Sequence, residues 1–452
     1  MTSFFLILLI ISISILNIFC RSKEEWKSRT IYQLLTDRFA SSTNSGNCDT
    51  SKYCGGNYQG LLQHLDYIEG MGFNAIWISP IIKNINNDWS YHGYSGINFY
   101  ELNSHFGSEE DLMNLITECH KRDIWIMVDV VANHVGGVGT DFSQIDPFNL
   151  AEHYHDWCEI DDWDNSWKIE NCRLGGLPDL KQENNWVTEQ LDYWIYYLVN
   201  KYNIDGIRID TVLEVPKWFW DKFSSSSSVY QVGEAFHGDI EKVYDYQYHL
   251  DAIFNYPLYF IILRSFKDSF EELGDYYNRL RYKYPHPELM STFIENHDNK
   301  RFLNENPNKA HFTNAVVFTL LWEGIPVHYY GGEQYYSGGG DPNNREALWN
   351  NYNTDSELYK IIAKVNNLRK KVNIWNYDVV QRECKPHLYA FTRGNVLACF
   401  SNDNGGTYSI TNHEFSDGDK LCNILEDDDC VIVSSNSINI QMGSYPKVYL
   451  KF

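Results

Sequence analysis

The stretch Ile207-Arg-Ile-Asp210 decides the fold, because it is a short apolar run that ends in a carboxylate. Two similar runs lead to Glu234, in Val-Gly-Glu-Ala, and to Asp298, in Ile-Glu-Asn-His-Asp. Polar residues at the carboxyl ends of several strands are how a β/α barrel builds an active site. Three such acids, with Arg208 and His297 beside them, suit acid/base and covalent chemistry on a sugar.

The rest of the chain supplies a barrel. Eight apolar segments are expected to be strands, at 31–37, 73–79, 124–131, 206–210, 230–234, 252–255, 292–295 and 326–330. Amphipathic helices fit between them at 61–71, 108–122, 185–200 and 308–323. This alternation predicts an α/β fold with a (β/α)8 TIM barrel. The serine run 224–228 is expected to form a surface loop.

Two further parts are expected. About fifty residues separate Asn133 from the helix that begins at 185, whereas ordinary connections have roughly two to six. We therefore expect a subdomain at 135–185, inserted after the third strand of a barrel made of 21–134 and 186–378. Alternating segments beyond 378 predict a C-terminal antiparallel β-sandwich domain at 379–452.

Residues 4–19 are almost wholly apolar and predict a secretory signal peptide at 1–20, removed after Cys20. An uncleaved membrane anchor is the alternative, although the run is shorter than the roughly 20 residues that span a bilayer. We expect a protein that is secreted, or that enters a secretory or digestive compartment, with no membrane contact after cleavage. The formal net charge of −23 repels phosphate backbones, so we expect no nucleic-acid partner.

Ten cysteines in a secreted chain suggest disulfides. Three pairs are close in sequence: Cys48 with Cys54, Cys158 with Cys172, and Cys422 with Cys430. Cys384 and Cys399 are expected on adjacent strands, and Cys119, in a predicted helix, is the expected free thiol.

Each acid has a catalytic and a structural interpretation. Asp210 projects from the same strand face as Arg208, which favours its ionised form and suits a nucleophile. Glu234 has apolar neighbours, which raise the pKa of a carboxyl and suit a general acid. Asp298 could oppose positive charge in an oxocarbenium-like transition state. The structural alternatives are an ion pair at Asp210, a helix-start cap at Glu234 and a helix N-cap at Asp298.

Other polar residues are expected at the same rim. Asn133 is an oxygen donor suited to Ca²⁺, and His92 and His134 are donors suited to sugar hydroxyls. Asp341 and Arg345 lie in a Gly-rich loop after the eighth strand, where a local ion pair in solvent is the alternative.

Four blocks in order, residues 129–134, 206–214, 233–235 and 294–298, resemble the four sequence regions of the α-amylase family of glycoside hydrolases, family 13. The resemblance is closest to the secreted fungal-type members. It extends from about residue 26 to about residue 368, and more loosely through the C-terminal domain. It implies a retaining endo-hydrolase of α-1,4-glucosidic bonds in starch, glycogen and maltooligosaccharides, which we expect to be a monomer.

The resemblance also assigns roles to residues. Asp210 would be the nucleophile, Glu234 the general acid/base and Asp298 the transition-state stabiliser. The sugar site would be shaped by His92, Tyr94, His134, Arg208, His297, Asp341 and Arg345, with Leu213 and Glu214 on the leaving-group side. Structural Ca²⁺ would bind Asn133, Asp179 and the main-chain carbonyls of Glu170 and Glu214, joining the inserted subdomain to the barrel.

The chain departs from the family at Leu213-Glu214, where relatives carry Lys-His, and at Ser95, where they often carry Trp. These changes predict altered product sizes rather than lost catalysis. Two alternatives stay open: a family member that prefers maltooligosaccharides or transfers glycosyl groups, and a non-catalytic, membrane-tethered interaction protein on the same scaffold.

Overall fold

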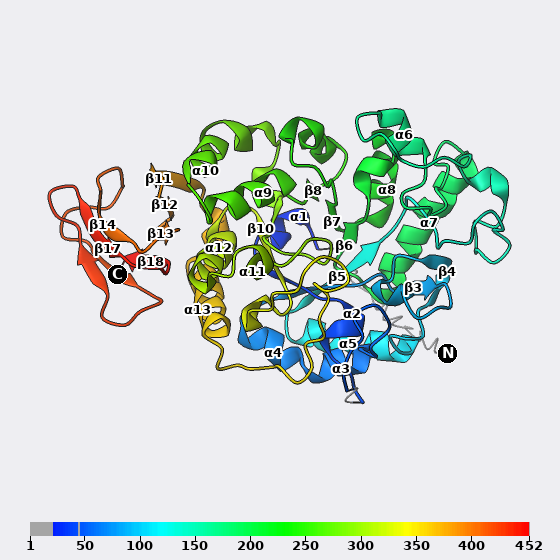
Figure 1. Cartoon of the computed structure of the whole chain (residues 1–452), viewed down its shortest axis with the longest axis horizontal. Coiled ribbons are helices and arrows are strands. Elements are labelled where there is room, and N and C mark those ends of the chain that lie inside the picture. The colour runs from blue at the N-terminus through cyan, green and yellow to red at the C-terminus, as the bar shows by residue number, and fades with distance from the viewer. Residues whose placement is uncertain (1–20, 44–45, 452) are drawn as a thin grey trace, which may run out of the picture.

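The computed structural model describes residues 21–43 and 46–451, and the predicted signal peptide lies outside these residues. Figure 1 shows a central barrel, a looped segment between β5 and α7 on one side, and a β domain on the other. Within the described ranges, no helix is long and apolar enough to cross a membrane.

Eight parallel strands form the barrel, as predicted. They are β1 (Ile31–Gln33), β2 (Ala75–Ile78), β5 (Trp125–Val130), β6 (Gly206–Ile209), β7 (Tyr230–Gly233), β8 (Ala252–Ile253), β9 (Ser291–Thr292) and β10 (Ile325–Tyr329). Their order is β8-β7-β6-β5-β2-β1-β10-β9. A parallel bridge between Phe254 and Ser291 joins the two ends, so the sheet closes. A hairpin of β3 (Ile82–Asn84) and β4 (Gly96–Leu102) follows β2.

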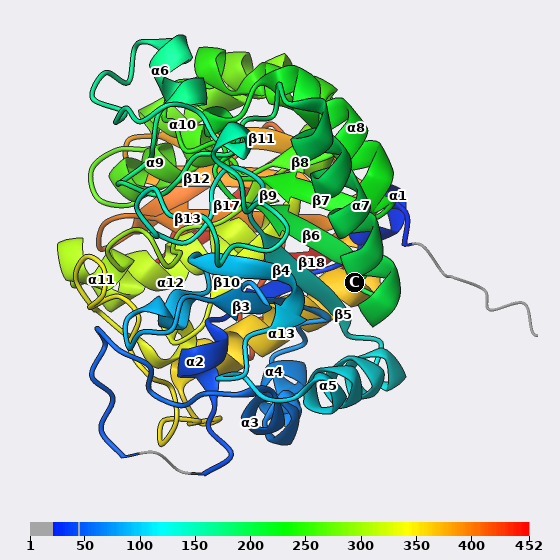
Figure 2. The ribbon, with the colours of Figure 1, turned by 90° about the vertical axis from the view of Figure 1, so that its right-hand side faces the viewer.

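Helices surround the strands (Figure 2). They are α1 (Lys23–Trp26), α2 (Thr36–Phe39), α3 (Tyr58–Gln63), α4 (Leu65–Gly70), α5 (Glu109–Lys121), α6 (Ser166–Asn171), α7 (Asn185–Tyr202), α8 (Lys217–Ser227), α9 (Tyr256–Ser265), α10 (Glu271–Asp275), α11 (Phe302–Glu305), α12 (Lys309–Leu321) and α13 (Glu357–Val372). Local sequence sets several boundaries. Ser108 and Asp111 form a capping box at the start of α5, and Asn184 caps α7.

Two expectations about helices are wrong in detail. The predicted helix 61–71 is two helices, α3 and α4, because the backbone of His64 leaves the helical conformation. Residues 224–227 of the serine run are the last turn of α8 rather than a loop, and Ser228 is the C-cap of that helix. Phe219, Trp220 and Phe223 form its buried face. Ser227 and Ser228 donate hydrogen bonds to carbonyls one turn earlier, at Ser224 and Ser225.

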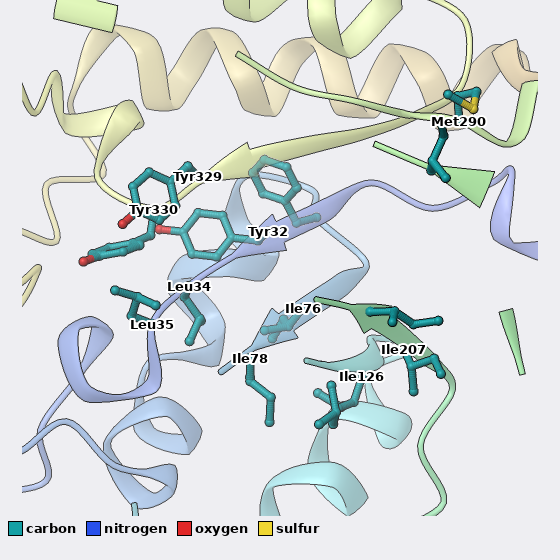
Figure 3. Packing of buried hydrophobic residues seen from close by; sticks show 14 of the residues in the cluster. Tyr32, Leu34, Leu35, Ile76, Ile78, Ile126, Ile207, Met290, Tyr329 and Tyr330 are labelled. Carbon is teal, nitrogen blue, oxygen red and sulfur yellow. The ribbon is translucent and has the colours of Figure 1, made fainter. Parts of the chain in front are cut away.

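Alternate residues of each strand serve two cores, as the period of a strand requires. Ile31, Ala75 and Met127 point into the barrel and pack with Trp77 and Trp125. Their neighbours point outward against the helices, and Figure 3 shows this outer core around Tyr32, Ile76, Ile126 and Ile207. Strands buried on both faces explain why each reads as a nearly continuous apolar run.

The C-terminal part is an antiparallel β-sandwich, as predicted. One sheet has the order β11 (Val379–Lys385), β12 (Leu388–Arg393), β13 (Val396–Ser401), β18 (Lys447–Lys451), β15 (Lys420–Asn423) and β16 (Cys430–Ile432). The other pairs β14 (Gly406–Ile410) with β17 (Ile438–Met442). A separate apolar cluster that includes Leu397, Ile410 and Ile440 fills the space between them.

The three pairs that are close in sequence form disulfides, at Cys48–Cys54, Cys158–Cys172 and Cys422–Cys430. Cys119 is a free, buried thiol, as expected. Cys384 and Cys399 are also free, and the expectation that they lie on adjacent strands is wrong because β12 separates β11 from β13.

Candidate active site

The buried guanidinium of Arg208, in β6, is the centre of a cluster of acids at the carboxyl ends of neighbouring strands. Its Nη1 lies 2.9 Å from Asp129 Oδ1 and 2.7 Å from Asp210 Oδ1, and its Nη2 lies 2.9 Å from Glu234 Oε2. Asp129 is directly opposite Arg208 in the pairing of β5 with β6. The structure therefore brings Asp210 and Glu234 together around one cation, from adjacent strands.

The surroundings of Glu234 favour its protonated form. Burial, helped by the negative charges of Asp210 and Asp298, raises the pKa of Glu234 to about 8 and outweighs the contact with Arg208. Tyr256 donates a hydrogen bond to Oε1 at 3.2 Å. A carboxyl that holds its proton near neutrality can serve as a general acid.

Asp298 reaches the same site from beyond β9, and Arg345 holds it there. Arg345 Nη2 lies 3.4 Å from Asp298 Oδ1, and its Nη1 lies 3.0 Å from Asp341 Oδ1. Arg345 Nε also donates to the main-chain oxygen of His297 at 2.9 Å. The Gly-rich loop that carries Asp341 and Arg345 is thus tied to the acid site, and the carboxyl of Asp298 stays 31% exposed.

A line of hydrogen bonds orients the rings beside the acids. Gln33 Nε2 lies 2.8 Å from His297 Nδ1, and His297 Nε2 lies 2.8 Å from the hydroxyl of Tyr94. Tyr94 in turn donates to Asp129 Oδ2 at 2.7 Å. With Gln33 as the donor, His297 carries its proton on Nε2, and burial lowers the pKa of His297 so that the ring stays neutral.

His92 is the next ring along this wall. It stacks on Tyr94 with ring centroids 5.5 Å apart, and its Nδ1 accepts a hydrogen bond from the Tyr94 N–H at 3.0 Å. Burial and the charge of Arg345 lower the pKa of His92 to about 3. His92 therefore offers Nε2–H as a neutral donor.

Three of the predicted site residues, His134, Leu213 and Glu214, make no hydrogen bond or ion pair to the three acids. His134 is buried, and its Nε2 has no hydrogen-bond partner within the described part of the chain. Leu213 is half-buried against the core. Glu214 is buried, its carboxyl makes no ion pair with any described residue, and burial, followed by the charge of Asp210, raises the pKa of Glu214 to about 8.

Sequence reasoning gave no role to three residues that the structure places against the acids: Tyr256, described above, Asp129 and Thr211. Asp129 was recognised only as the start of a motif, but it shares Arg208 with Asp210 and also accepts from Trp77 Nε1 at 3.1 Å. Thr211 donates its N–H to Glu234 Oε2 at 3.3 Å and its hydroxyl to Asp210 Oδ2 at 3.1 Å. Its position directly after Asp210 was the available signal.

The donors expected for Ca²⁺ converge. One end of the Asn133 side-chain amide lies 3.0 Å from Asp179 Oδ1 and 3.1 Å from the main-chain oxygen of Glu214. Turned with nitrogen toward them, the amide donates two hydrogen bonds; turned with oxygen toward them, it completes a set of three oxygens of the kind that binds Ca²⁺. Contacts between α6 and Val212–Glu214 bring the segment of Glu170 alongside.

No cluster of three His, Cys, Asp or Glu side chains suited to a metal occurs among residues 21–43 and 46–451. The set around Asn133 instead relies on amide and main-chain oxygens, which Ca²⁺ accepts. The residues therefore fit the ion.

A closed (β/α)8 barrel that gathers carboxyls around one arginine at its carboxyl end defines a glycoside-hydrolase type of site. The α-amylase catalytic-domain family matches residues 33–376. An α-amylase of Saccharomycopsis fibuligera is 38% identical over 94% of this chain and 92% of the relative. α-Amylase 2 of Schizosaccharomyces pombe is 40% identical over 87% of this chain and 72% of the relative.

Solved structures agree. An α-amylase from Malbranchea cinnamomea superposes with a TM-score of 0.92 at 39% identity, over 95% of this chain and 97% of that one. An α-amylase from Geobacillus thermoleovorans, complexed with acarbose, gives a TM-score of 0.87 at 31% identity, over 94% and 99% of the two chains. The chain belongs to the α-amylase family. Its enzymatic activity is that of an α-amylase.

Proposed function

We propose that the chain is a retaining, endo-acting hydrolase of α-1,4-glucosidic bonds in starch, glycogen and maltooligosaccharides. The observation that supports this most is the contact of Asp210 and Glu234 with one guanidinium, because a retaining enzyme needs its two carboxyls close together. The different environments of the two acids support different roles.

In the proposed reaction, Asp210 attacks the anomeric carbon while Glu234 gives its proton to the glycosidic oxygen, and the leaving chain departs. Glu234, now ionised, takes a proton from water as that water attacks the same carbon. The bond to Asp210 breaks and both acids return to their starting states. Asp298, oriented by Arg345, opposes the positive charge that develops on the sugar ring.

We further propose that Asn133, Asp179 and the main-chain oxygens of Glu170 and Glu214 hold Ca²⁺. When bound, the ion would supply a structural link between the segment 135–185 and the barrel. Secretion of a monomer is also part of the proposal, and the three disulfides support an oxidising destination.

The first test is proton NMR of the Ca²⁺-loaded protein with maltoheptaose, following the anomeric signals of the earliest products. Early release of the α-anomer is expected. Early release of the β-anomer would contradict a retaining mechanism, and absence of cleavage by folded protein would contradict the proposed hydrolase.

One observation favours a second candidate, a relative that prefers short maltooligosaccharides or transfers glycosyl groups. Leu213 and Glu214 follow Asp210 closely, and the buried carboxyl of Glu214 has no ion-pair partner among the described residues. The sizes of the products and the ratio of transfer to hydrolysis in the same experiment decide between the two.

A further inference from the structure

A half-open cavity of about 500 Å³ lies on the segment between β5 and α7. Its wall combines two tryptophans with polar side chains. The lining residues that matter are Trp157, Trp167, His155, Asn171, Lys181 and Glu183. None of these six belongs to the cluster around Arg208, so the cavity is separate from the acid site.

The two tryptophans present indole faces to solvent. Trp157 is 58% exposed and Trp167 is 61% exposed, whereas side chains of this size are mostly buried in proteins. The guanidinium of Arg173 lies 3.8 Å from the centre of the Trp157 ring and covers one face. The other face is left for a ligand.

The backbone segments that carry the two tryptophans are tied together. Trp157 directly precedes Cys158, and α6, which carries Trp167, is followed by Cys172, so the disulfide between these cysteines ties the two segments together. Asn171 Nδ2 also donates to the main-chain oxygen of Trp167 at 2.9 Å. The backbone of this wall is therefore restrained before a ligand binds.

The polar side chains suit a neutral ligand rich in hydroxyls. Lys181 and Glu183 put one positive and one negative group on the wall, and the carboxyl of Glu183 is 42% exposed while it accepts from His155 Nε2 at 2.9 Å. Donors, acceptors and flat apolar faces in one cavity match a pyranose ring, which has hydroxyls around its rim and C–H groups on its faces.

The helix α6 links the wall of the cavity to the acid site. The helix α6 packs against Val212–Glu214, the short turn that follows Asp210. Figure 1 shows α6 beside α8, on the same side of the barrel as β6 and β7. One helix of the cavity wall thus lies against the turn that follows Asp210.

We propose that this cavity is a second binding site for an α-1,4-glucan chain. Trp157 and Trp167 stack on glucose rings, and Asn171, Lys181 and Glu183 bind hydroxyls. This inference rests on the proposed function, because its ligand is a remote part of the polymer that the acid site cleaves.

The test measures binding of the full chain, loaded with Ca²⁺, to starch granules and to maltoheptaose. Glu234→Gln is present in every variant, so that bound glucan is not cleaved. Trp157→Ala combined with Trp167→Ala is expected to weaken binding to granules about tenfold, because two aromatic stacking contacts are lost. Tyr196→Ala is the matched control, since Tyr196 is 54% exposed on α7 and does not line the cavity.

Equal granule binding by the double variant and the Glu234→Gln parent would overturn the inference. Circular dichroism and thermal unfolding check that the variants are folded, and Trp167→Ala alone, which leaves Cys158 and its neighbour intact, replaces the double variant if that one unfolds. Failure of the proposed function looks different: the native sequence would then neither cleave maltoheptaose nor bind granules.

Discussion

Thr211 has a backbone conformation that is rare for its side chain. Its φ of 48° and ψ of 52° are left-handed, which costs a β-branched residue of the order of 1–3 kcal/mol. The same turn allows its N–H to reach Glu234 and its hydroxyl to reach Asp210. The strained residue is therefore the one that directly follows Asp210 and donates hydrogen bonds to both Asp210 and Glu234.

Replacement of Thr211 separates these effects. Thr211→Ala removes the hydroxyl bond to a charged group, so kcat is expected to fall about tenfold. The free energy of unfolding should change by less than about 1 kcal/mol, because alanine crowds a left-handed backbone less than threonine does. Thr211→Ser, which keeps the hydroxyl, is the control, and an unchanged kcat in Thr211→Ala would refute a positioning role.

The pH dependence of activity should follow Glu234. With a pKa of about 8, its proton is present below that pH, and kcat/KM is expected to decline as the pH rises through it. Tyr256 donates to the carboxylate, so Tyr256→Phe removes a contact that favours ionisation and should move the alkaline decline to higher pH. Tyr259→Phe, another buried tyrosine of α9, should leave the profile in place.

The same shift affects stability. The raised pKa means that folding favours the protonated carboxyl, so this contribution to the free energy of unfolding is complete below the ordinary glutamate pKa and is lost as the pH rises through about 8.

For the activity profile, a decline of kcat/KM that does not respond to Tyr256→Phe would show that a group other than Glu234 controls the decline.

Leu213 and Glu214 should govern the sizes of the products. Leu213→Lys combined with Glu214→His restores the cation and ring of the fungal-type pattern, and the distribution of products from maltoheptaose is expected to change. Chromatography of early products gives the answer, and an identical distribution would exclude these positions from the leaving-group side.

Helix α12 depends on two arginines from other elements for its C-terminal carbonyls. Arg369 of α13 donates to the oxygen of Leu320, and Arg393 of β12 donates to the oxygens of Leu321 at 3.3 Å and Trp322 at 2.6 Å. Both guanidiniums are buried, and cations at this end of a helix oppose its dipole. The β-sandwich thereby completes a helix of the barrel.

Arg393→Met should therefore destabilise the barrel as well as the sandwich. Loss of the donor leaves buried carbonyls unsatisfied, and we expect the free energy of unfolding to fall by about 2 kcal/mol in a denaturant titration. Lys385→Met, at an exposed lysine of β11 that pairs with Glu383, should have a much smaller effect. A loss confined to the sandwich would contradict the coupling.

Elements that are buried on both faces were the most predictable. Apolar runs such as those of β5 and β6 are typical of buried parallel strands, and the presence of eight such runs predicted the barrel. The serine run was mispredicted because serine has little helix preference of its own, and the burial of Phe219 and Phe223 decided its conformation. The role of Asp129 could not be predicted without knowing the order of the strands, because the pairing of β5 with β6 places Asp129 opposite Arg208.

The whole chain is held together by closure of the sheet, by disulfides and, in the proposed function, by Ca²⁺. Removal of Ca²⁺ with EDTA should lower the thermal midpoint, because an ion that binds only the folded state stabilises it by about 2.7 kcal/mol at a hundred times its Kd. Asn133→Ala should abolish this response. Asn165→Ala, at the N-cap of α6, is the control, and a midpoint insensitive to EDTA would contradict the site.

Because Asp210 and Glu234 contact the same guanidinium, a change in the charge of Asp210 during the proposed reaction changes the pKa of Glu234. Once Asp210 is esterified by the sugar, its charge disappears, and with it one of the influences that hold the proton on Glu234. The pKa of Glu234 then falls, because the contact with Arg208 is no longer opposed by the charge of Asp210. Glu234 therefore stays ionised after it has given up its proton, which is the form that can accept a proton from water. Its proton affinity thus alternates within each turnover, and formation of the covalent intermediate itself prepares the next step.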